Sequence, residues 1–257
     1  MTLVNKNYFN VGNNAHVLAK KCIIAEIDTA RFTLKLNNKK VILFDLDGTL
    51  INSAPDLALA VNHMLETLNR DTFAEEIIGG WVGNGAQVLV NRALSGRRKI
   101  DPDLNRALSA EALDIFLTFY AKNLCISTVA YPHVPVTLKI LKGMGYRLAI
   151  VTNKPFAFVA PILEGLELEG LFELILGGDS LPQKKPDPAP LLYVCDKLSV
   201  SVDECVMVGD SKNDILAANG CGMQSVAVTY GYNYGEDIGI YDPDMVVDDF
   251  ENLLKIL

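Results

Sequence analysis

The chain has 257 residues, half of them hydrophobic, and a formal net charge of −8 at pH 7. This length allows one large domain or two small ones with a substantial core, and the hydrophobic content excludes disorder throughout. The acidic balance argues against a general nucleic-acid binder and against a protein that binds anionic membranes, because both need a basic surface.

The cysteines and the apolar runs indicate the compartment. Five cysteines are odd in number and form no Cys-x-x-Cys pair: Cys22, Cys125, Cys195, Cys205 and Cys221. We interpret them as reduced thiols of a cytoplasmic protein, and not as a disulfide framework or a zinc site. No apolar run approaches the length of a membrane span, so we expect no membrane partner.

Residues 1–39 precede the first strong pattern. Lys20 and Lys21 stand before a short apolar stretch that lacks the longer core of a secretory signal. Residues 23–36 alternate well enough for one or two strands, but nothing there carries chemistry. We therefore expect residues 1–39 to be an appended, poorly ordered leader before a domain that begins at Lys40.

Residues 41–50 read Val-Ile-Leu-Phe-Asp-Leu-Asp-Gly-Thr-Leu. The apolar run predicts a buried, parallel strand that presents Asp45 and Asp47 at its carboxyl edge, where open α/β sheets bind ligands. Alternation along a strand places both carboxylates on one side, with Leu46 turned away, and their repulsion favours a cation between them. Gly48 allows a tight turn, after which backbone amides can hold an anion. This stretch predicts a phosphate-processing site.

Apolar residues then recur at helical spacing over residues 57–68 and 103–124, with no convincing strand between them. We predict that residues 54–133 form a helical cap domain, inserted after the first core strand and lying over the carboxyl edge of the sheet. Within it, Gly83, Asn84 and Gly85 precede an apolar-periodic helix. Glycines and free amides at a helix start favour a small anion such as a carboxylate, and the alternative is an ordinary glycine-rich helix start.

From residue 134 onward, helices and strands alternate. The expected strands cover residues 147–152, 172–176, 205–208, 225–228 and 245–247, and the expected helices cover residues 137–145, 156–166, 188–198 and 213–219, with a last one from 250. Such alternation predicts βαβ units with right-handed crossovers. Residues 40–53 and 134–257 should therefore form an α/β, Rossmann-like, three-layer core around a parallel sheet.

Polar residues follow three further strands of this core. Thr152 and Asn153 offer a hydroxyl and an amide to phosphate oxygens, and Lys185 lies on a loop stiffened by prolines. Asp210 ends a strand, and Asp214 follows one helical turn later on the same face. Each signal alone has an ordinary alternative as a helix cap or a solvated side chain.

Four segments, taken in order, resemble the four motifs of the haloacid dehalogenase-like hydrolase superfamily: Asp-x-Asp-Gly-Thr, Thr-Asn, Lys-Pro and Gly-Asp-x-x-x-Asp. The resemblance extends from Val41 to the C-terminus. The resemblance implies that Asp45 is a nucleophile and Asp47 a general acid and base. It also implies Mg²⁺, bound by the carboxylates of Asp45 and Asp210 and the backbone carbonyl of Asp47. Asp214 would reach the metal through water or orient Lys185.

The same resemblance supplies a set of groups that would hold the phosphoryl oxygens. They are Thr152, Asn153, Lys185 and the backbone amides that follow Asp45, from Leu46 to Gly48.

Three further segments narrow the resemblance from the superfamily to one of its families: Asn52-Ser-Ala-Pro-Asp-Leu, Trp81-Val-Gly-Asn-Gly85 and Thr229-Tyr-Gly-Tyr-Asn-Tyr-Gly235. They are similar to the bacterial phosphoglycolate phosphatase family, which implies hydrolysis of 2-phosphoglycolate, a by-product of DNA repair, to glycolate and phosphate. Asn52 departs from the aspartate more usual in that family, and we expect only an indirect effect. We expect a small phosphate ester as substrate, no nucleic-acid partner, and a monomer or weak homodimer.

Two alternatives stay open at this point. One is a phosphatase or phosphomutase of the same fold that acts on a sugar phosphate, although a mutase usually needs a basic cap residue for a second phosphate. The other is a non-catalytic, phosphate-dependent regulator, which the loss of Asp45 or Asp47 would have favoured. A dehalogenase is disfavoured because Asp47 would have no alcohol leaving group to protonate.

Overall fold

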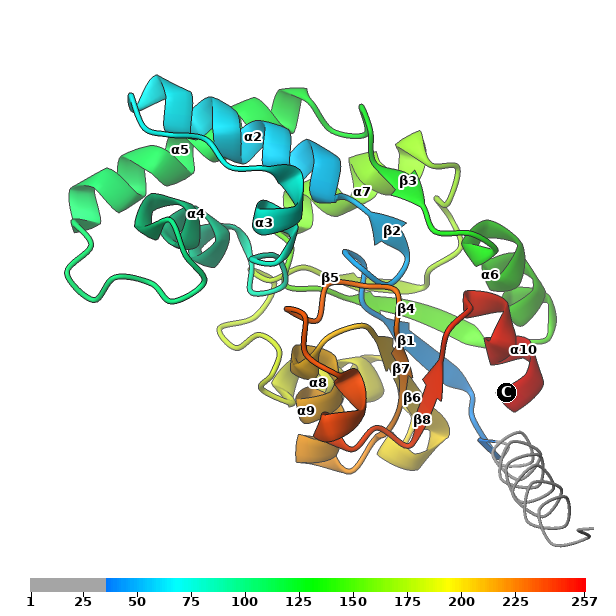
Figure 1. The fold of residues 1–257 in the computed structure, drawn as a ribbon. Coiled ribbons are helices and arrows are strands. Elements are labelled where there is room, and N and C mark those ends of the chain that lie inside the picture. Colours follow the sequence, from blue (N-terminus) through cyan, green and yellow to red (C-terminus); the bar gives the residue numbers. More distant parts are fainter. Residues whose placement is uncertain (1–35) are drawn as a thin grey trace, which may run out of the picture. The chain divides into compact units, whose positions relative to one another are not determined.

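The computed structural model describes residues 36–257 (Figure 1). Residues 38–254 form one compact unit. Residues 36–37 and 255–257 belong to a second unit, in which the amide of Leu36 donates a hydrogen bond to the carbonyl of Ile256. The expected leader, and the strands expected within residues 23–36, lie outside the described residues apart from residues 36–39.

The larger unit is built on a parallel sheet of six strands in the order β5-β4-β1-β6-β7-β8. The strands are β1 (Val41–Phe44), β4 (Arg147–Val151), β5 (Leu174–Leu176), β6 (Cys205–Gly209), β7 (Gln224–Val228) and β8 (Met245–Val247). β1 lies in the middle, and all four of its residues are buried. Helices therefore cover both faces of the sheet, as an apolar strand of a parallel sheet requires.

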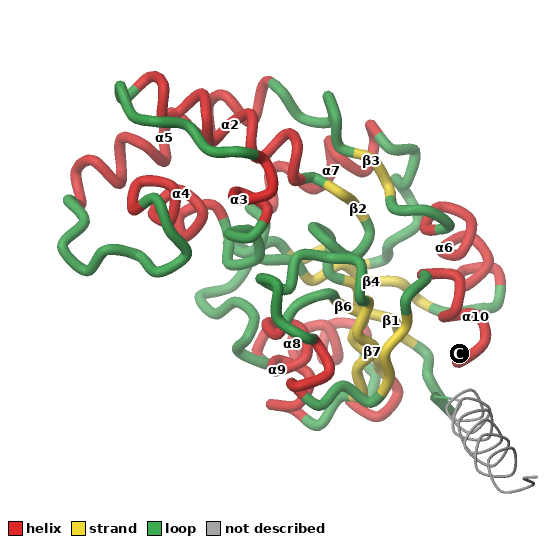
Figure 2. Tube along the Cα trace, in the orientation of Figure 1, coloured by secondary structure: helices red, strands yellow, loops and turns green. Residues whose placement is uncertain are grey.

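Alternate side chains of β1 face the two helical layers. Val41 and Leu43 belong to an apolar cluster with residues of α8 (Ala189–Leu198) and α9 (Lys212–Cys221). Phe44 packs instead against Phe172 and Phe250, with ring centroids 6.4 and 5.7 Å apart. Figure 2 shows helices on both sides of the strands. Two further helices of the core are α6 (Val134–Gly143) and α7 (Phe156–Gly165), with short 3-10 turns η1 (Val202–Glu204), η2 (Ile238–Tyr241) and η3 (Phe250–Asn252). The last helix of the chain, α10 (Leu253–Ile256), begins in the larger unit and ends in the second one.

Four helices follow β1 and group together away from the sheet (Figure 1). They are α2 (Ala54–Thr67), α3 (Glu75–Gly79), α4 (Ala86–Ser95) and α5 (Arg106–Lys122). The long helices α2 and α5 pack on one another, and His63 of α2 stacks on Phe119 of α5 with centroids 4.0 Å apart. The side chain of Asn105 accepts two amide hydrogen bonds and caps α5.

A two-stranded antiparallel ribbon connects these helices to the core. It pairs β2 (Ile51–Asn52) with β3 (Val129–Ala130). The buried carboxylate of Asp56 accepts hydrogen bonds from the amides of residues 126–128 at 2.8–3.0 Å. The chain thus leaves and re-enters the core through neighbouring strands, a feature that the sequence did not predict.

Several element bounds differ from the sequence prediction. α6 begins at Val134 instead of residue 137, because Pro135 fits the first turn of a helix, where its missing N–H has no partner to lose. β5 is limited to three residues, and Phe172 lies before it. No helix within residues 36–257 is both long and apolar enough to cross a membrane.

Candidate active site

The carboxyl ends of three neighbouring strands bring the predicted site residues together. Phe44, the last residue of β1, pairs with Ile150 of β4 on one side and Val208 of β6 on the other. The residues just beyond these strand ends, Asp45, Thr152 and Asp210, therefore lie at one edge of the sheet. Because β4 and β6 flank β1 on opposite sides, this edge is the point where the strand order reverses, the usual ligand crevice of such sheets.

Three buried carboxylates form a cluster at this edge. Asp45, Asp210 and Asp214 each offer one oxygen, and these oxygens lie within 4.8 Å of one another. Lys185 lies among them, with its Nζ 3.0 Å from Asp45 and 2.6 Å from Asp214. Burial raises the pKa of Asp45 to about 7, although Lys185 opposes the shift. Burial, with the charges of Asp214 and Asp45, holds the pKa of Asp210 well above its usual value.

The charge balance of this cluster suits a divalent cation. Were all three carboxylates ionised, the one ammonium of Lys185 would leave two uncompensated negative charges in a buried site, and crowding of this kind agrees with the raised pKa values of Asp45 and Asp210. Oxygen ligands of this kind are those that Mg²⁺ and Ca²⁺ prefer. The residues present therefore fit a hard divalent metal ion.

Neighbouring groups fix each carboxylate of the cluster. Thr49 Oγ1 and the amide of Tyr232 donate hydrogen bonds of 2.7 Å to the two oxygens of Asp210. Asp214 accepts from Lys185 through one oxygen and from the amide and hydroxyl of Ser211 through the other. Of the two roles expected for Asp214, the orientation of Lys185 matches these contacts directly.

Gly48 provides the turn that the sequence suggested. Its φ of +92° lies in the region that favours glycine, and a Cβ at this position would overlap the Asp210 carboxylate. The amide of Leu46 donates a hydrogen bond of 2.7 Å to the carboxylate of Asp45 itself. The turn therefore brings the backbone close to the acid cluster.

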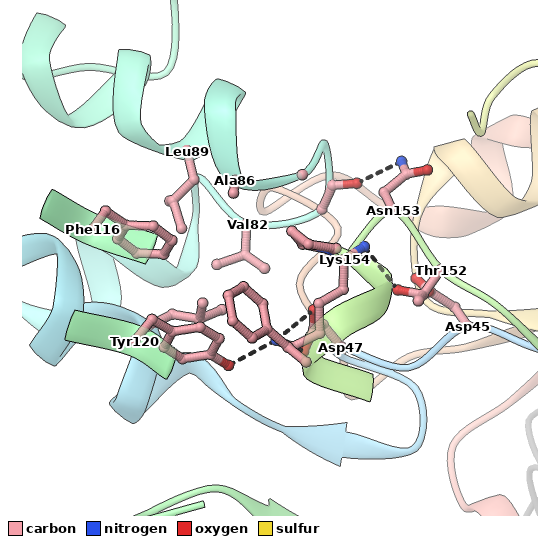
Figure 3. A pocket seen from close by; sticks show the side chains of 15 residues that line it. Asp45, Asp47, Val82, Ala86, Leu89, Phe116, Tyr120, Thr152, Asn153 and Lys154 are labelled. Atoms are coloured by element: carbon pink, nitrogen blue, oxygen red, sulfur yellow. Dashed lines mark hydrogen bonds and ion pairs between the residues drawn. The ribbon is translucent and has the colours of Figure 1, made fainter. Parts of the chain in front are cut away.

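The side chain of Asp47 lies apart from the acid cluster. Lys154 Nζ contacts its two carboxylate oxygens at 3.0 and 3.2 Å, and the hydroxyl of Ser53 donates to it at 2.6 Å. Lys154 also donates to the hydroxyl of Tyr120 in α5 at 2.7 Å (Figure 3). Each of the two aspartates thus has its own lysine, Lys185 for Asp45 and Lys154 for Asp47.

Burial alone would lower the pKa of Lys154, but Asp47 and Tyr120 outweigh that effect and raise it. The same buried setting raises the pKa of Tyr120 to about 12. At neutral pH this part of the site consequently holds an ammonium and a neutral phenol.

Thr152 and Asn153 lie where the sequence predicted, but their contacts are with protein. Thr152 Oγ1 accepts a hydrogen bond from the amide of Lys154 at 3.2 Å. Asn153 Nδ2 donates to the carbonyls of Gly83 and Lys185, at 3.0 and 2.9 Å. Its Oδ1 is buried and has no hydrogen-bond partner among the described residues. Asn153 therefore connects the strand edge to the loop before α4.

The glycine-rich loop at residues 83–85 contacts the core on several sides. The carbonyl of Gly83 also accepts from Asn213 at 3.0 Å. The side-chain oxygen of Asn84 accepts from Tyr234 and Arg92, at 2.7 and 2.9 Å. Gly83 and Gly85, both at positive φ, line the pocket described next, whereas the Asn84 side chain is held among these partners.

A pocket extends from the two aspartates toward the helices that follow β1 (Figure 3). Asp45, Asp47, Thr152, Asn153 and Lys154 form its polar side. Its apolar walls come from Leu57, Val82, Leu89, Phe116 and Phe158. Lys154 is the one cationic side chain among the described residues that line it, so the pocket can hold a small anionic group beside two carboxylates.

Sequence reasoning missed several contributors to this site. Lys154 follows Thr152 and Asn153 just after the end of β4, within a segment that resembles the family, but no role was predicted for it. Tyr120 showed only helical periodicity, although its hydroxyl reaches Lys154. Thr49 is the last residue of the first motif and Ser53 follows it by four residues, but neither gave a signal for the partner that it contacts.

A family model described as haloacid dehalogenase-like hydrolase matches residues 42–228. The chain belongs to this family. The predicted membership in the haloacid dehalogenase-like hydrolases and the predicted α/β fold are therefore confirmed.

Relatives within the haloacid dehalogenase-like hydrolases are similar over nearly their whole length. The chain is 56% identical over 221 residues to the phosphoglycolate phosphatase of Colwellia psychrerythraea, covering 86% of this chain and 98% of that protein. It is 47% identical over 221 residues to the phosphoglycolate phosphatase of Psychrobacter arcticus, covering 86% and 96%. A crystal structure of a predicted phosphoglycolate phosphatase from Haemophilus somnus 129PT has a TM-score of 0.80 at 43% identity, covering 86% of this chain and 98% of that one.

Proposed function

We propose that this protein is a Mg²⁺-dependent phosphatase that hydrolyses 2-phosphoglycolate to glycolate and phosphate. The observation that carries the proposal is the separate setting of two aspartates two residues apart: Asp45 lies in the acid cluster with Lys185, and Asp47 lies outside it with Lys154. Two carboxylates in different surroundings suit two different tasks in one reaction. The names of the relatives in Colwellia and Psychrobacter support the choice of substrate.

The reaction proceeds in two displacements. A carboxylate oxygen of Asp45 attacks phosphorus while the bond from phosphorus to the glycolate oxygen breaks, and Asp47 gives that oxygen a proton. Water then attacks the phosphorus of the aspartyl phosphate, and Asp47 takes a proton from it. The bond between phosphorus and Asp45 breaks, which releases phosphate and restores both aspartates.

The acid cluster would hold Mg²⁺ through the carboxylates of Asp45 and Asp210 and the backbone carbonyl of Asp47. A bound Mg²⁺ ion supplies positive charge against the phosphoryl oxygens and the anionic nucleophile. Lys185 adds a second positive charge, and Asp214 keeps its ammonium in place. Thr152, with the backbone from Leu46 to Gly48, would bind the remaining phosphoryl oxygens.

We assign the recognition of the leaving group to the segment that follows β1. In this division residues 54–133 are the cap, and residues 40–53 and 134–257 are the catalytic core. The cap contributes apolar walls to the pocket, including Leu57, Leu89 and Phe116. Such walls suit a small leaving group better than a sugar, whose hydroxyls need hydrogen-bond partners.

The test is phosphate release by the purified full chain with Mg²⁺, comparing kcat/KM for 2-phosphoglycolate with that for sugar phosphates and nucleotides. We expect a preference of about a hundredfold or more, which corresponds to roughly 2.7 kcal/mol of selective transition-state binding. Similar kcat/KM values for all the esters would leave the phosphatase activity in place but overturn the assignment of 2-phosphoglycolate as the substrate. Preference for a sugar phosphate, or phosphoryl transfer within one, would favour the alternative enzyme, and no release from any ester would favour the regulator.

A further inference from the structure

We propose that Lys154 binds the carboxylate of the substrate, and that Tyr120 positions the ammonium that does so. This inference rests on the proposed function, since it names the protein side chain that recognises the carboxylate by which 2-phosphoglycolate differs from other small phosphate esters. The relevant geometry is the buried contact of one lysine with both Asp47 and a tyrosine of α5 (Figure 3).

Charge within the pocket singles out Lys154. It is only 4% exposed and is the one cation among the described lining residues. Both buried lysines of the site are ion-paired, Lys154 with Asp47 and Lys185 with Asp45 and Asp214, but Lys185 does not line the pocket. Arg92 lies near the glycine loop, but its guanidinium donates to Asn84 and to the carbonyl of Trp81.

The position of Asp47 places a substrate carboxylate within reach of this lysine. Asp47 is the proposed donor to the ester oxygen, and its two oxygens lie 3.0 and 3.2 Å from Lys154 Nζ. In 2-phosphoglycolate a single methylene separates the ester oxygen from the carboxyl carbon. An ester oxygen beside Asp47 therefore brings the substrate carboxylate next to Lys154. Because Lys154 Nζ already contacts Asp47 and Tyr120, the substrate carboxylate would share this ammonium with Asp47.

Tyr120 holds the ammonium from the opposite side. Its hydroxyl accepts a hydrogen bond of 2.7 Å from Lys154 Nζ. Its ring stacks on Phe116 and meets Phe158 edge to face, with centroids 5.7 and 5.2 Å apart, so the hydroxyl has a fixed position. In this apolar setting an ammonium attracts a carboxylate more strongly than it would in water. The recognition thus combines a lysine at the end of β4 with a tyrosine of α5.

A different role for Lys154 would be to hold Asp47 in place and nothing more. The two roles predict different substrate dependence. Loss of a pure positioning contact slows every phosphate ester by a similar factor, because each ester needs Asp47. Loss of a carboxylate-binding group slows only esters that carry a carboxylate.

The experiment compares two substrates of the same shape, 2-phosphoglycolate and its carboxamide analogue, in which –CONH₂ replaces the carboxylate. The measured quantity is the ratio of their kcat/KM values in the wild type, Lys154→Met, Tyr120→Phe and Lys197→Met. Lys197 is an exposed lysine of α8 whose ammonium lies over Tyr193, so its variant loses the same charge away from the pocket.

We expect the ratio to fall about thirtyfold in Lys154→Met, by the loss of one charged hydrogen-bonding partner. Tyr120→Phe should lower it several-fold, roughly three- to tenfold, and Lys197→Met should leave it unchanged. Equal losses on both substrates in Lys154→Met would overturn the proposal. If the wild type hydrolysed 2-phosphoglycolate and its carboxamide analogue with equal kcat/KM, the proposal would also be overturned, and this result does not depend on whether Lys154→Met folds. Failure of the wild type to hydrolyse 2-phosphoglycolate at all would instead count against the proposed function.

Discussion

The side-chain nitrogen of Asn153 donates a hydrogen bond of 3.0 Å to the carbonyl of Gly83, and so joins the end of β4 to the loop before α4. The same nitrogen donates to the carbonyl of Lys185 at 2.9 Å. One amide therefore fixes the loop at residues 83–85 relative to the lysine of the acid cluster. Small displacements of this loop should consequently affect turnover more than stability.

The two ends of α4 offer a matched test of that loop. Gly85, at the N-terminus, has a φ of +86°, and a Cβ there would lie 2.9 Å from the carbonyl oxygen of Asn153. Gly96, at the C-terminus, has a φ of +63°, and its Cβ would come no closer than 3.4 Å to Phe73. We expect Gly85→Ala to lower kcat/KM about tenfold or more by displacing the loop. Gly96→Ala should cost about 1 kcal/mol of unfolding free energy and leave kcat/KM nearly unchanged. Steady-state kinetics and urea unfolding would measure both, and equal activity in the two variants would contradict the expectation.

Asp45→Asn should abolish turnover while the protein stays folded. The change keeps the shape of the side chain and removes one charge from a crowded acid cluster, so stability should not fall. We expect a loss in kcat of about a thousandfold or more. Mass spectrometry of acid-quenched reactions should detect a phosphorylated wild type and no phosphorylated variant. A folded variant with normal turnover would show that another group attacks phosphorus.

Asp210→Asn should change metal-free and metal-bound stability in opposite directions. Its carboxylate is buried near Asp45 and Asp214, so neutralising it should raise the melting temperature in EDTA. Mg²⁺ at about a hundred times its Kd should stabilise the wild type by roughly 2.7 kcal/mol and the variant by much less. Thermal unfolding with and without Mg²⁺ measures both effects, with the exposed Asp196→Asn of α8 as control. The same Mg²⁺ response in Asp210→Asn and in the wild type would place the metal elsewhere.

His133 should contribute a pH-dependent part of the stability. Its Nδ1 lies 2.8 Å from the carboxylate of Asp249, and the hydrogen bond and charge of that group raise the pKa of His133 above 6.5. Because the folded state binds this proton more tightly, the contribution is complete below the unfolded pKa and is lost as pH rises through the folded pKa. His133→Asn, which tolerates the left-handed backbone at this position, should therefore be less stable than wild type near about pH 5.5 and equal to it near about pH 9. Urea unfolding across this range is the measurement, and a difference independent of pH would exclude the ion pair as its cause.

The strand ends of this fold could be read from the sequence because two signals coincide there. The apolar run of β1 stops at Asp45 and that of β6 stops at Asp210, so the strand and the polar side chain that it presents are predicted together. Parallel pairing then places such residues at one edge without further information. The α/β core and the acid cluster follow from local patterns for this reason.

Other parts could not be read in this way, because they depend on partners distant in the sequence. The pairing of Ile51 with Ala130 involves strands of two residues, which are too short to show alternation. Lys154 becomes informative only when Asp47 and Tyr120 are known to surround it. The conformation of the loop at residues 83–85 likewise depends on Asn153 and Asn213, far along the chain.

The ribbon of β2 and β3 also bears on how such a protein can diversify. Because the intervening segment starts and ends on paired strands, its two attachment points are one strand spacing apart, about 5 Å. Any replacement segment whose termini meet that single requirement could be grafted without changing the strand order of the sheet. If the proposed function holds, the segment between β2 and β3 could change, and with it the choice of leaving group, while Asp45 and Asp210 keep their places beyond the ends of β1 and β6.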